Sequence, residues 1–440
     1  MRALEIIAKK RDGQILSSEE IDFFVQGFTR GEIPDYQAAA WLMAIYLNGM
    51  NKRETIDLTM SMARSGKMLD LSEIAPVVAD KHSTGGVGDK TTLVVAPLVA
   101  ATGVPVGKVT GRGLGFSGGT VDKLESIPSF NATLDAEQFL RVLAQHGIAV
   151  TGQTADLAPA DGKLYALRDA TATIAKIPLI ASSIMSKKIA GGASCIVLDV
   201  KVGSGTFMRT EEEAVALAQL MVEIGESLGR RMAAVISDMN QPLGFAVGNA
   251  LEVREALDTL LGRGPEDLLE HCMVIASQML VLAGRAEDDL NARRILEEAL
   301  NSGRALDKFR EWIAAQGGDI SFIENPSLLP QAKFIEDLRS PRSGYISRVE
   351  ACEIGLASML LGAGRAKKGE SIDHAVGIVL AKKIGDYVKK GEPLLTIHAN
   401  DERKLEEVKG KLLAAYDWSE EPVQPPPLIY RIIRGDMPGH

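Results

Sequence analysis

Two glycine-rich segments that lie close together in the chain constrain its fold more than any other feature. The first covers residues 80–92 (DKHSTGGVGDKTT) and the second covers residues 108–120 (KVTGRGLGFSGGT). Each follows a short run rich in β-branched residues, at 76–78 and at 104–106, and each opens into an apolar segment. This order predicts a strand, a loop and a helix, twice in succession, as in an open α/β sheet.

The composition of both loops indicates an anion site. Glycines let backbone N–H groups converge on an anion, and a helix N-terminus adds the positive end of a dipole. Lysines and hydroxyls on the same loops supply charge and further donors. Because open α/β sheets bind ligands at the carboxyl ends of their strands, we expect a phosphate site built from two neighbouring strand ends. His82, between Lys81 and Ser83, is then expected to donate a proton or to contact a bound base.

Two common phosphate-binding motifs do not fit these loops. A P-loop requires G-x-x-x-x-G-K-[ST], and here Asp89 separates Gly88 from Lys90. Residues 113–118 match G-x-G-x-x-G, but Pro128 shortens the helix that follows. No clear second strand ends in an acidic residue at the distance that a dinucleotide site requires. The loops therefore predict a different phosphate site.

Composition limits the class of protein. A chain of 440 residues predicts two or three domains, and 46% hydrophobic with 24% charged residues is ordinary for globular proteins. The net charge of −9 argues against nucleic acid or acidic membranes as the main partner. No apolar run reaches the ~18 residues that span a bilayer, and we expect no signal peptide because basic residues interrupt the segment 2–11. The three cysteines, Cys195, Cys272 and Cys352, are widely spaced, and we expect them to be buried thiols. Free thiols are typical of a cytoplasmic protein, so we expect that location.

The pattern of apolar residues predicts an α/β protein with a helical domain, a larger α/β domain with a mixed sheet, and a C-terminal α+β extension. Residues 38–47 are almost wholly apolar, which favours a helix that is buried, here against a second subunit. We expect these regions in order: 1–70, the first part of the helical domain; 71–155, the first part of the α/β phosphate-binding domain; 156–192, a helical segment that returns to the helical domain; 193–330, the second part of the α/β domain; 331–345, a connection; and 346–434, the C-terminal unit.

Several motifs, spread over nearly the whole chain, carry a family resemblance. They are residues 80–89, 111–115, 118–125, 158–161, 165–169, 182–188, 200–205 and 248–253. Together they resemble the pyrimidine-nucleoside and thymidine phosphorylases. The resemblance implies reversible phosphorolysis of uridine, thymidine or deoxyuridine to the free base and an α-pentose 1-phosphate, with inversion at C1′. It also implies a homodimer and no cofactor required for the chemistry.

The resemblance also implies roles for individual residues. The phosphate ligands are Lys81, His82, Ser83, Thr92, Lys108, Thr110 and Thr120. The base contacts are Arg168, Ser183, Lys187 and Phe116, and the catalytic residues are His82, Arg168 and Lys187. Cationic donors aimed at the departing pyrimidine stabilise the charge that develops in the transition state. Phosphate and base contacts come from different domains, so we expect the domains to close around the substrates.

The second glycine loop departs from the family pattern. Relatives usually carry a histidine before a threonine or serine, where this chain has Phe116 and Ser117. Phenylalanine can form the wall of a pocket but cannot hydrogen-bond a base edge, so the preference among pyrimidines is open. Relatives often have a serine at the position of Thr110, and threonine keeps the hydroxyl group.

A second departure concerns a structural potassium ion that the resemblance implies. Some relatives have a threonine where this chain has Lys90. The ion is expected among Gly88, Lys90, Leu243, Ala246 and Glu255, whose oxygens suit a hard cation. The Lys90 ammonium is expected either to occupy that place or to repel the ion.

Two other functions compete with the phosphorylase. A phosphoribosyltransferase of related fold needs magnesium for pyrophosphate, and no carboxylate cluster is clearly offered for it. A non-catalytic nucleoside- or phosphate-binding protein is supported only by Phe116. The presence of Lys81, His82, Arg168 and Lys187 speaks against it.

Overall fold

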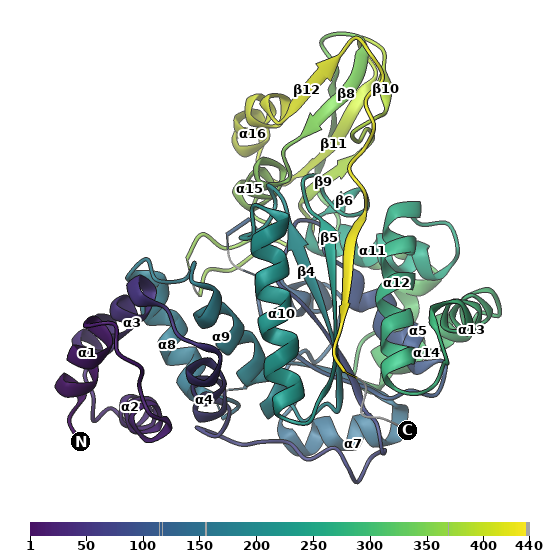
Figure 1. Ribbon diagram of the computed structural model, residues 1–440. Helices are drawn as coiled ribbons and strands as arrows, with labels where there is room; N and C mark the ends of the chain where they lie inside the picture. Colours follow the sequence, from purple (N-terminus) through teal and green to yellow (C-terminus); the bar gives the residue numbers. More distant parts are fainter. Residues whose placement is uncertain (114, 117, 155, 368, 437–440) are drawn as a thin grey trace.

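The computed structural model describes residues 1–113, 115–116, 118–154, 156–367 and 369–436. It consists of a helical domain, a central α/β domain and a C-terminal unit that projects from the α/β domain (Figure 1). Within the described residues, no helix is long and apolar enough to cross a membrane.

The helical domain combines two distant parts of the sequence. Its helices are α1 (Ala3–Arg11), α2 (Ser18–Arg30), α3 (Asp35–Asn48), α4 (Lys52–Ala63), α8 (Pro159–Ala170) and α9 (Ile177–Ala190). Ser17 and Asn51 each form a capping box, which fixes the starts of α2 and α4. The core is centred on the stacked rings of Phe24 and Trp41 and includes Leu164 of α8. Helices α8 and α9 therefore contribute to the core of the helical domain.

The central sheet has the strand order β13-β5-β4-β1-β2-β3. Its strands are β1 (Ala79–Ser83), β2 (Val106–Thr110), β3 (Ile148–Gly152), β4 (Cys195–Val202), β5 (Arg231–Asp238) and β13 (Ile429–Arg434). Strands β1 to β5 are parallel to one another, and β13 is antiparallel to β5, so the sheet is mixed as predicted. Because β1 lies beside β2, both glycine loops leave the same edge of the sheet from neighbouring strands.

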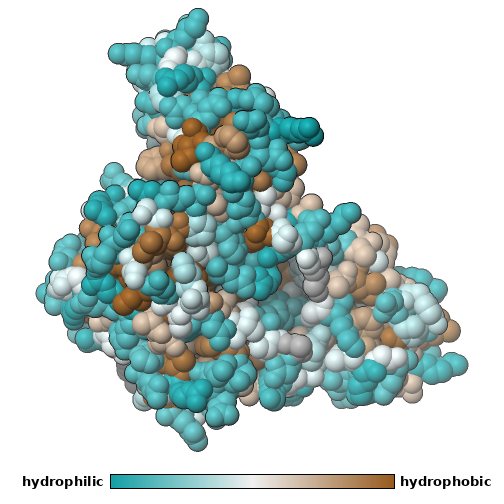
Figure 2. Space-filling model, turned by 180° about the vertical axis from the view of Figure 1, so that it is seen from behind, coloured by the Kyte–Doolittle hydropathy of each residue, from teal (hydrophilic) through white to brown (hydrophobic). Residues whose placement is uncertain are grey.

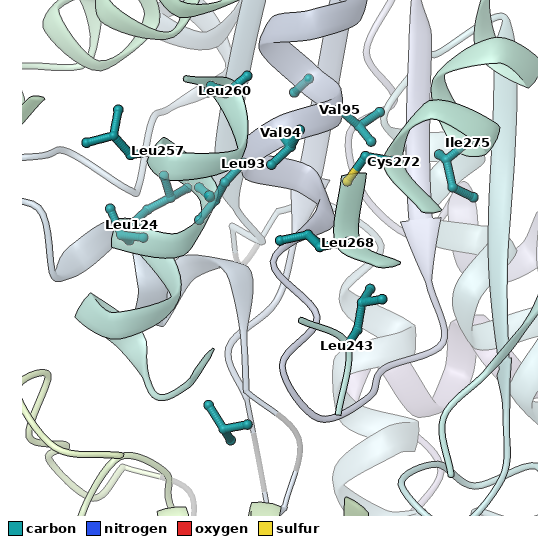
Figure 3. Close-up of a cluster of buried hydrophobic side chains, with 14 of the residues drawn as sticks. Leu93, Val94, Val95, Leu124, Leu243, Leu257, Leu260, Leu268, Cys272 and Ile275 are labelled. Carbon is teal, nitrogen blue, oxygen red and sulfur yellow. The ribbon is translucent and has the colours of Figure 1, made fainter. Parts of the chain in front are cut away.

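Helices cover both faces of this sheet. The remaining helices of the domain are α5 (Thr91–Ala100), α6 (Thr120–Glu125), α7 (Ala136–His146), α10 (Glu211–Ser227), α11 (Asn249–Leu260), α12 (Glu266–Leu282), α13 (Asp289–Asn301) and α14 (Arg304–Ala315). Helix α5, directly after the first glycine loop, is buried along its whole length. Figure 3 shows Leu93 of α5 close to Leu257 of α11, within a cluster that also holds Leu268 of α12. The first loop therefore rests on a rigid core.

The exact place of the first strand differs from the prediction. We expected strand at 76–78 and loop from residue 80, but β1 runs from Ala79 to Ser83, so Asp80 and Lys81 lie inside the sheet. Both side chains are buried, and ion pairs make that possible: Asp80 with Lys188 at 2.7 Å and Lys81 with Asp199 at 3.1 Å. Similarly, β2 begins at Val106 and continues to Thr110.

The C-terminal unit contains two small sheets, in the orders β10-β8-β12 and β6-β9-β11-β7. Its elements are β6 (Ala246–Val247), β7 (Phe334–Arg339), β8 (Gly344–Val349), α15 (Ala351–Leu361), β9 (Gly377–Leu380), β10 (Tyr387–Val388), β11 (Pro393–Ala399), α16 (Glu402–Ala414) and β12 (Tyr416–Ser419). Two short 3₁₀ helices, Ile320–Ile323 and Pro326–Leu328, precede it.

Two predicted boundaries of this unit are wrong. The expected connection at 331–345 contains β7, whose charged residues gave it the pattern of a loop. It is an edge strand, and edge strands commonly carry charge because one side meets solvent. The unit also does not extend to residue 434, because β13 crosses back and pairs with β5 of the central sheet.

Candidate active site

Lys81 is at the base of the first glycine loop. Its ammonium group donates to the Thr91 hydroxyl at the start of α5 and lies 3.1 Å from Asp199 and 3.6 Å from Asp89. Burial acts to lower the pKa of Lys81, but Asp89 and Asp199 outweigh it and hold that pKa above its usual value. Lys81 therefore stays positively charged inside the protein.

Lys108 occupies the neighbouring strand β2. Its ammonium group donates to the main-chain carbonyl of Lys81, and its closest carboxylate oxygen, on Asp80, is 3.9 Å away. Burial and the positive charge of Lys188 lower the pKa of Lys108 to about 7, although Asp80 acts in the opposite direction. Lys108 is thus a buried lysine whose charge is only weakly compensated.

His82 lies on β1 and is partly buried, and several lysines act on its charge state. Burial, followed by the ammonium groups of Lys188 and Lys108, lowers the pKa of His82 well below its usual value. Lys187 and Lys81 act in the same direction. The free protein therefore holds a neutral imidazole, which can donate one N–H but is not already protonated.

The predicted phosphate hydroxyls lie along the two loops. Ser83 ends β1 and accepts a hydrogen bond from the Gly85 N–H at 3.2 Å. Thr92 is buried in the first turn of α5, and Thr110 ends β2. Thr120 begins α6, at the far end of the second loop. The sheet brings the strand-end residues together at one edge, as the sequence predicts.

Three of the four predicted base contacts, Arg168, Ser183 and Lys187, lie on α8 and α9 of the helical domain. Lys187 donates to the Ser183 hydroxyl at 3.1 Å and forms an ion pair with Asp161. Arg168 is buried and donates to the main-chain carbonyls of Thr173, Ile174 and Leu179, at 3.4, 2.9 and 3.0 Å.

Arg168 keeps its charge and part of its hydrogen-bonding capacity. Burial lowers the pKa of Arg168, but a guanidinium remains protonated at any ordinary pH. Three of its N–H groups are engaged by carbonyls, and a guanidinium carries about five such donors in all. The remaining donors are the ones that a substrate could engage.

Helix α9 connects the two halves of the site. Lys188, next to Lys187, donates to Asp80 of β1 at 2.7 Å and to the Val109 carbonyl of β2 at 2.8 Å. This double anchor fixes α9 on the strands that carry the phosphate loops. Because of this anchor, Lys187 of the helical domain lies close enough to lower the pKa of His82 on β1. Figure 2 shows the surface hollowed between the helical and α/β domains.

The second glycine loop is held by the C-terminal unit. Arg365 donates to Asp122 at 2.7 Å, and the other oxygen of that carboxylate accepts the Gly113 N–H at 2.7 Å. The Gly115 N–H donates to the Arg365 carbonyl at 3.0 Å. Leu114 and Ser117 lie outside the described residues.

Phe116 forms part of an aromatic pair. Its ring centroid is 5.8 Å from that of Phe207, which follows β4 and is half exposed. The structure thus places a second ring beside the position where relatives were expected to have histidine.

Comparison with known proteins identifies the family of this chain. Residues 75–306 match the a/b domain of a glycosyl transferase family, residues 4–66 match the helical bundle domain of that family, and residues 345–419 match the pyrimidine nucleoside phosphorylase C-terminal domain. The chain is 56% identical over 430 residues to the pyrimidine-nucleoside phosphorylase of Geobacillus stearothermophilus, covering 98% of this chain and 99% of that protein. The chain belongs to the pyrimidine-nucleoside phosphorylase family.

Other relatives extend the comparison. The enzyme of the same name from Staphylococcus aureus strain N315 is 56% identical over 433 residues, covering 98% of this chain and all 100% of that protein. A crystal structure of anthranilate phosphoribosyltransferase from Thermus thermophilus superposes with a TM-score of 0.59 at 19% identity, covering 71% of this chain and 99% of that one. At this identity the likeness shows a shared fold only.

The residues expected around potassium do come together in the structure. The Lys90 ammonium donates to the main-chain carbonyls of Leu243 and Ala246, at 2.9 and 2.8 Å, and forms an ion pair with Glu255. A Cβ on Gly88 would lie 3.4 Å from the same ammonium. No cluster of three or more His, Cys, Asp or Glu suited to a metal occurs in the part of the chain that the structure describes.

The sequence did not point to the buried charges behind Lys81. Asp199 and Lys201 lie on β4, and the Nε2 atom of His271 is 3.0 Å from the Asp199 carboxylate and 2.9 Å from the Lys201 ammonium. Burial would raise the pKa of Asp199, but His271 and Lys201 hold it well below its usual value. The one feature of the sequence that could have indicated these buried charges is the presence of Asp199 and Lys201 within an otherwise apolar strand.

Proposed function

We propose that this protein catalyses the reversible phosphorolysis of pyrimidine nucleosides, namely uridine, thymidine and deoxyuridine. The products are the free base and an α-D-ribose or deoxyribose 1-phosphate. One observation carries the proposal: Lys188 anchors α9 on β1 and β2, which brings Lys187 into electrostatic reach of His82. The donors predicted for the base therefore lie close to those predicted for the phosphate, which supports a single site for both. Membership of the phosphorylase family supports the same reaction.

The phosphate is the nucleophile in this reaction. Lys81 shares its charge with Asp89 and Asp199, so it neutralises a bound phosphate only in part and leaves the attacking oxygen nucleophilic. Attack on C1′ from the face opposite the base inverts the configuration and gives the α-anomer. Holding both reactants in line accounts for much of the rate enhancement.

The departing base is stabilised from the helical domain. Negative charge develops on the pyrimidine oxygens as the glycosidic bond breaks. Lys187 offers a point charge and Arg168 its remaining N–H groups, and both act more strongly on the transition state than on the nucleoside. Phosphate bound beside His82 raises the pKa of this imidazole, since it places negative charge near it, and so favours a proton for the departing base.

Base release is the direct test of the proposal. Free base is measured from uridine, thymidine and deoxyuridine, each with and without inorganic phosphate. Release that requires phosphate is expected with at least one nucleoside. A folded protein that releases no base would instead indicate a non-catalytic binding protein.

A pair of lysine variants tests the role given to α9. Lys187→Met removes the cation that faces the base and is expected to lower kcat/KM by roughly 10²–10³-fold, as for the loss of one electrostatic donor. Lys163→Met changes the same residue type at an exposed position of α8, where the Lys163 ammonium donates to the Thr29 carbonyl and to no other group among the described residues. That control is expected to keep its activity. Equal activity in both variants would exclude Lys187 from the reaction.

We also propose that the protein is a homodimer formed through α3. Three large apolar side chains on this helix are exposed in the single chain: Tyr36 at 75%, Met43 at 37% and Leu47 at 71%. Their spacing of seven and four residues places them on one face of the helix. Sedimentation equilibrium is expected to give a dimer mass, and Leu47→Glu is expected to shift it toward the monomer. A monomeric parent protein would refute the proposal.

A cytoplasmic location and closure of the domains complete the proposal. All three cysteines are free, as suits a reducing compartment. Closure is expected because the base donors and phosphate donors come from different domains. Small-angle scattering with a nucleoside and a non-reactive phosphate analogue should give a smaller radius of gyration than the free protein, and an unchanged envelope would count against closure.

A further inference from the structure

The Lys90 side chain is enclosed in a cage of oxygen atoms. Its side chain is 0% exposed, although lysine is among the residues least often buried. The ammonium is held by the carbonyls of Leu243 and Ala246 and by the Glu255 carboxylate. A Cβ on Gly244 would come within 3.1 Å of it, so the cage is closed on that side.

The cage joins three separate segments of the chain. Lys90 ends the first glycine loop, Leu243 and Ala246 belong to the segment after β5, and Glu255 lies on α11. The Glu255 carboxylate also accepts the N–H groups of Phe245 and Ala246, at 2.9 and 3.0 Å. Without a positive charge at the centre, two carbonyls and a carboxylate would face one another in a buried space. A cation is therefore a structural requirement at this point.

The charges around the cage already balance. Asp267 accepts the Gly244 N–H at 3.1 Å and forms an ion pair with Lys383 of the C-terminal unit. Lys90 and Lys383 carry two positive charges, and Glu255 and Asp267 carry two negative charges. A potassium ion added to these ligands would lie directly against the Lys90 ammonium and would leave the buried cluster with excess positive charge. The residues present do not fit a potassium ion together with Lys90.

We propose that the Lys90 ammonium is a built-in cation that takes the place of a monovalent metal ion in this cage. The protein then needs no potassium for its stability. Removal of the ammonium group converts the cage into a site for a free monovalent cation, potassium or ammonium, since the carbonyls and Glu255 remain. This inference concerns the folding of the phosphate loop and does not depend on which reaction the site catalyses.

Thermal unfolding in two salts tests the proposal. Parent protein, Lys90→Thr and Lys10→Thr are compared in potassium chloride and in tetramethylammonium chloride at equal ionic strength. Lys10 is the matched control because it is also buried and pairs with a buried carboxylate, Glu54, at 2.8 Å, but its ammonium has no other hydrogen-bond partner in the described part of the chain. Tetramethylammonium is too large to enter the cage.

The expected melting temperatures differ among the three proteins. The parent melts at the same temperature in both salts. Lys90→Thr melts roughly 5 °C or more lower in tetramethylammonium, as for a broken buried ion pair, and recovers at least half of the loss as potassium is titrated to saturation. Lys10→Thr is destabilised equally in both salts. Lys90→Met, which fills the space without a charge, is not rescued by potassium.

Two results would overturn the inference. One is a saturable rise in the melting temperature of the parent protein with potassium, because an ion would then bind despite Lys90. The other is a Lys90→Thr protein that is no more stable in potassium than in tetramethylammonium, or that does not fold in potassium while Lys90→Met folds. The titration of the parent protein requires no variant to fold.

Discussion

The pKa of Lys108 gives the sharpest prediction about phosphate binding. Burial and the nearby Lys188 lower this pKa to about 7, so the free protein loses the Lys108 charge just above neutral pH. A phosphate bound at the predicted site is expected to supply the missing counterion and to raise the pKa of Lys108 again. Phosphate binding at pH 8 is therefore expected to take up close to one proton, because Lys108 becomes charged only in the complex.

The size of the effect follows from the shift. From the ordinary value of 10.5 to about 7, the difference is about 3.5 pKa units, or about 5 kcal/mol against the charged form, at about 1.36 kcal/mol per unit. Above pH 7, each further pH unit leaves Lys108 uncharged in ten times more of the free protein. The dissociation constant for phosphate is then expected to rise about tenfold per pH unit between pH 7.5 and 9.

Calorimetry measures both quantities. Phosphate is titrated into the protein at pH 8 in two buffers of different ionisation enthalpy, and the difference in observed heat gives the number of protons taken up. His82 is neutral in the free protein at this pH, because its own pKa lies well below the usual value. Lys108→Met should abolish the uptake and weaken binding, whereas Lys163→Met should leave both unchanged.

Stability gives an independent check with a defined sign. The folded pKa of Lys108 lies below its unfolded value, so the unfolded chain binds more protons between pH 7 and 10.5, and this group makes the protein more stable as pH rises through that window. Without phosphate, Lys108→Met should therefore have a higher free energy of unfolding than the parent. The difference should be largest at pH 7 and below, at most about 5 kcal/mol, and smaller at pH 9, about 2 kcal/mol. A phosphate affinity that is flat from pH 6 to 9, with no proton uptake at pH 8, would refute the reasoning.

Three further variants test other contacts of the site. Phe116→His should change the ratio of kcat/KM for uridine over thymidine by roughly fivefold, the worth of about one hydrogen bond, and equal ratios in both proteins would contradict this. Arg365→Ala removes the closer of two guanidinium partners of the Asp122 carboxylate and leaves Arg112 at 3.2 Å, so the hold of Asp122 on the second glycine loop should weaken. The KM for phosphate should then rise several-fold while the melting temperature falls; an unchanged KM would mean that the C-terminal unit does not support the loop. Asp199→Asn removes a carboxylate that keeps the Lys81 pKa high, so phosphate affinity should fall more at pH 9 than at pH 6, and a uniform loss would count against that role.

Local patterns in the sequence were enough to predict much of the fold. The run at 195–202 is apolar at nearly every position, which indicates a strand buried on both faces, and β4 is such a strand. The helix at 177–190 and the helix after the first loop could also be predicted, because the sequence signals of each lie within a few neighbouring residues. The chemistry of the phosphate loops was also local, because glycines, lysines and hydroxyls occur there together.

Features that depend on distant partners could not be predicted. The sequence around Asp80 and Lys81 has the composition of a loop, and its burial in a central strand depends on Lys188 and Asp199, which are more than a hundred residues away. Likewise, β13 joins the central sheet because it pairs with β5, which no local pattern indicates. Propensity gives way to tertiary contacts at such positions.

The arrangement of counterions predicts which lysine should respond most to phosphate. Lys81 has Asp199 at 3.1 Å, and Lys188 has Asp80 at 2.7 Å, so both are compensated before any ligand binds. Lys108 lies 3.9 Å from the same Asp80, whose other oxygen is already engaged by Lys188. Charge repulsion from Lys188 and weak compensation by Asp80 both act on one buried ammonium, and an anion at the strand ends relieves both. Among the described residues, Lys108 therefore has no carboxylate closer than 3.9 Å at the place where phosphate is expected to bind, and we expect a bound phosphate to complete the charge network.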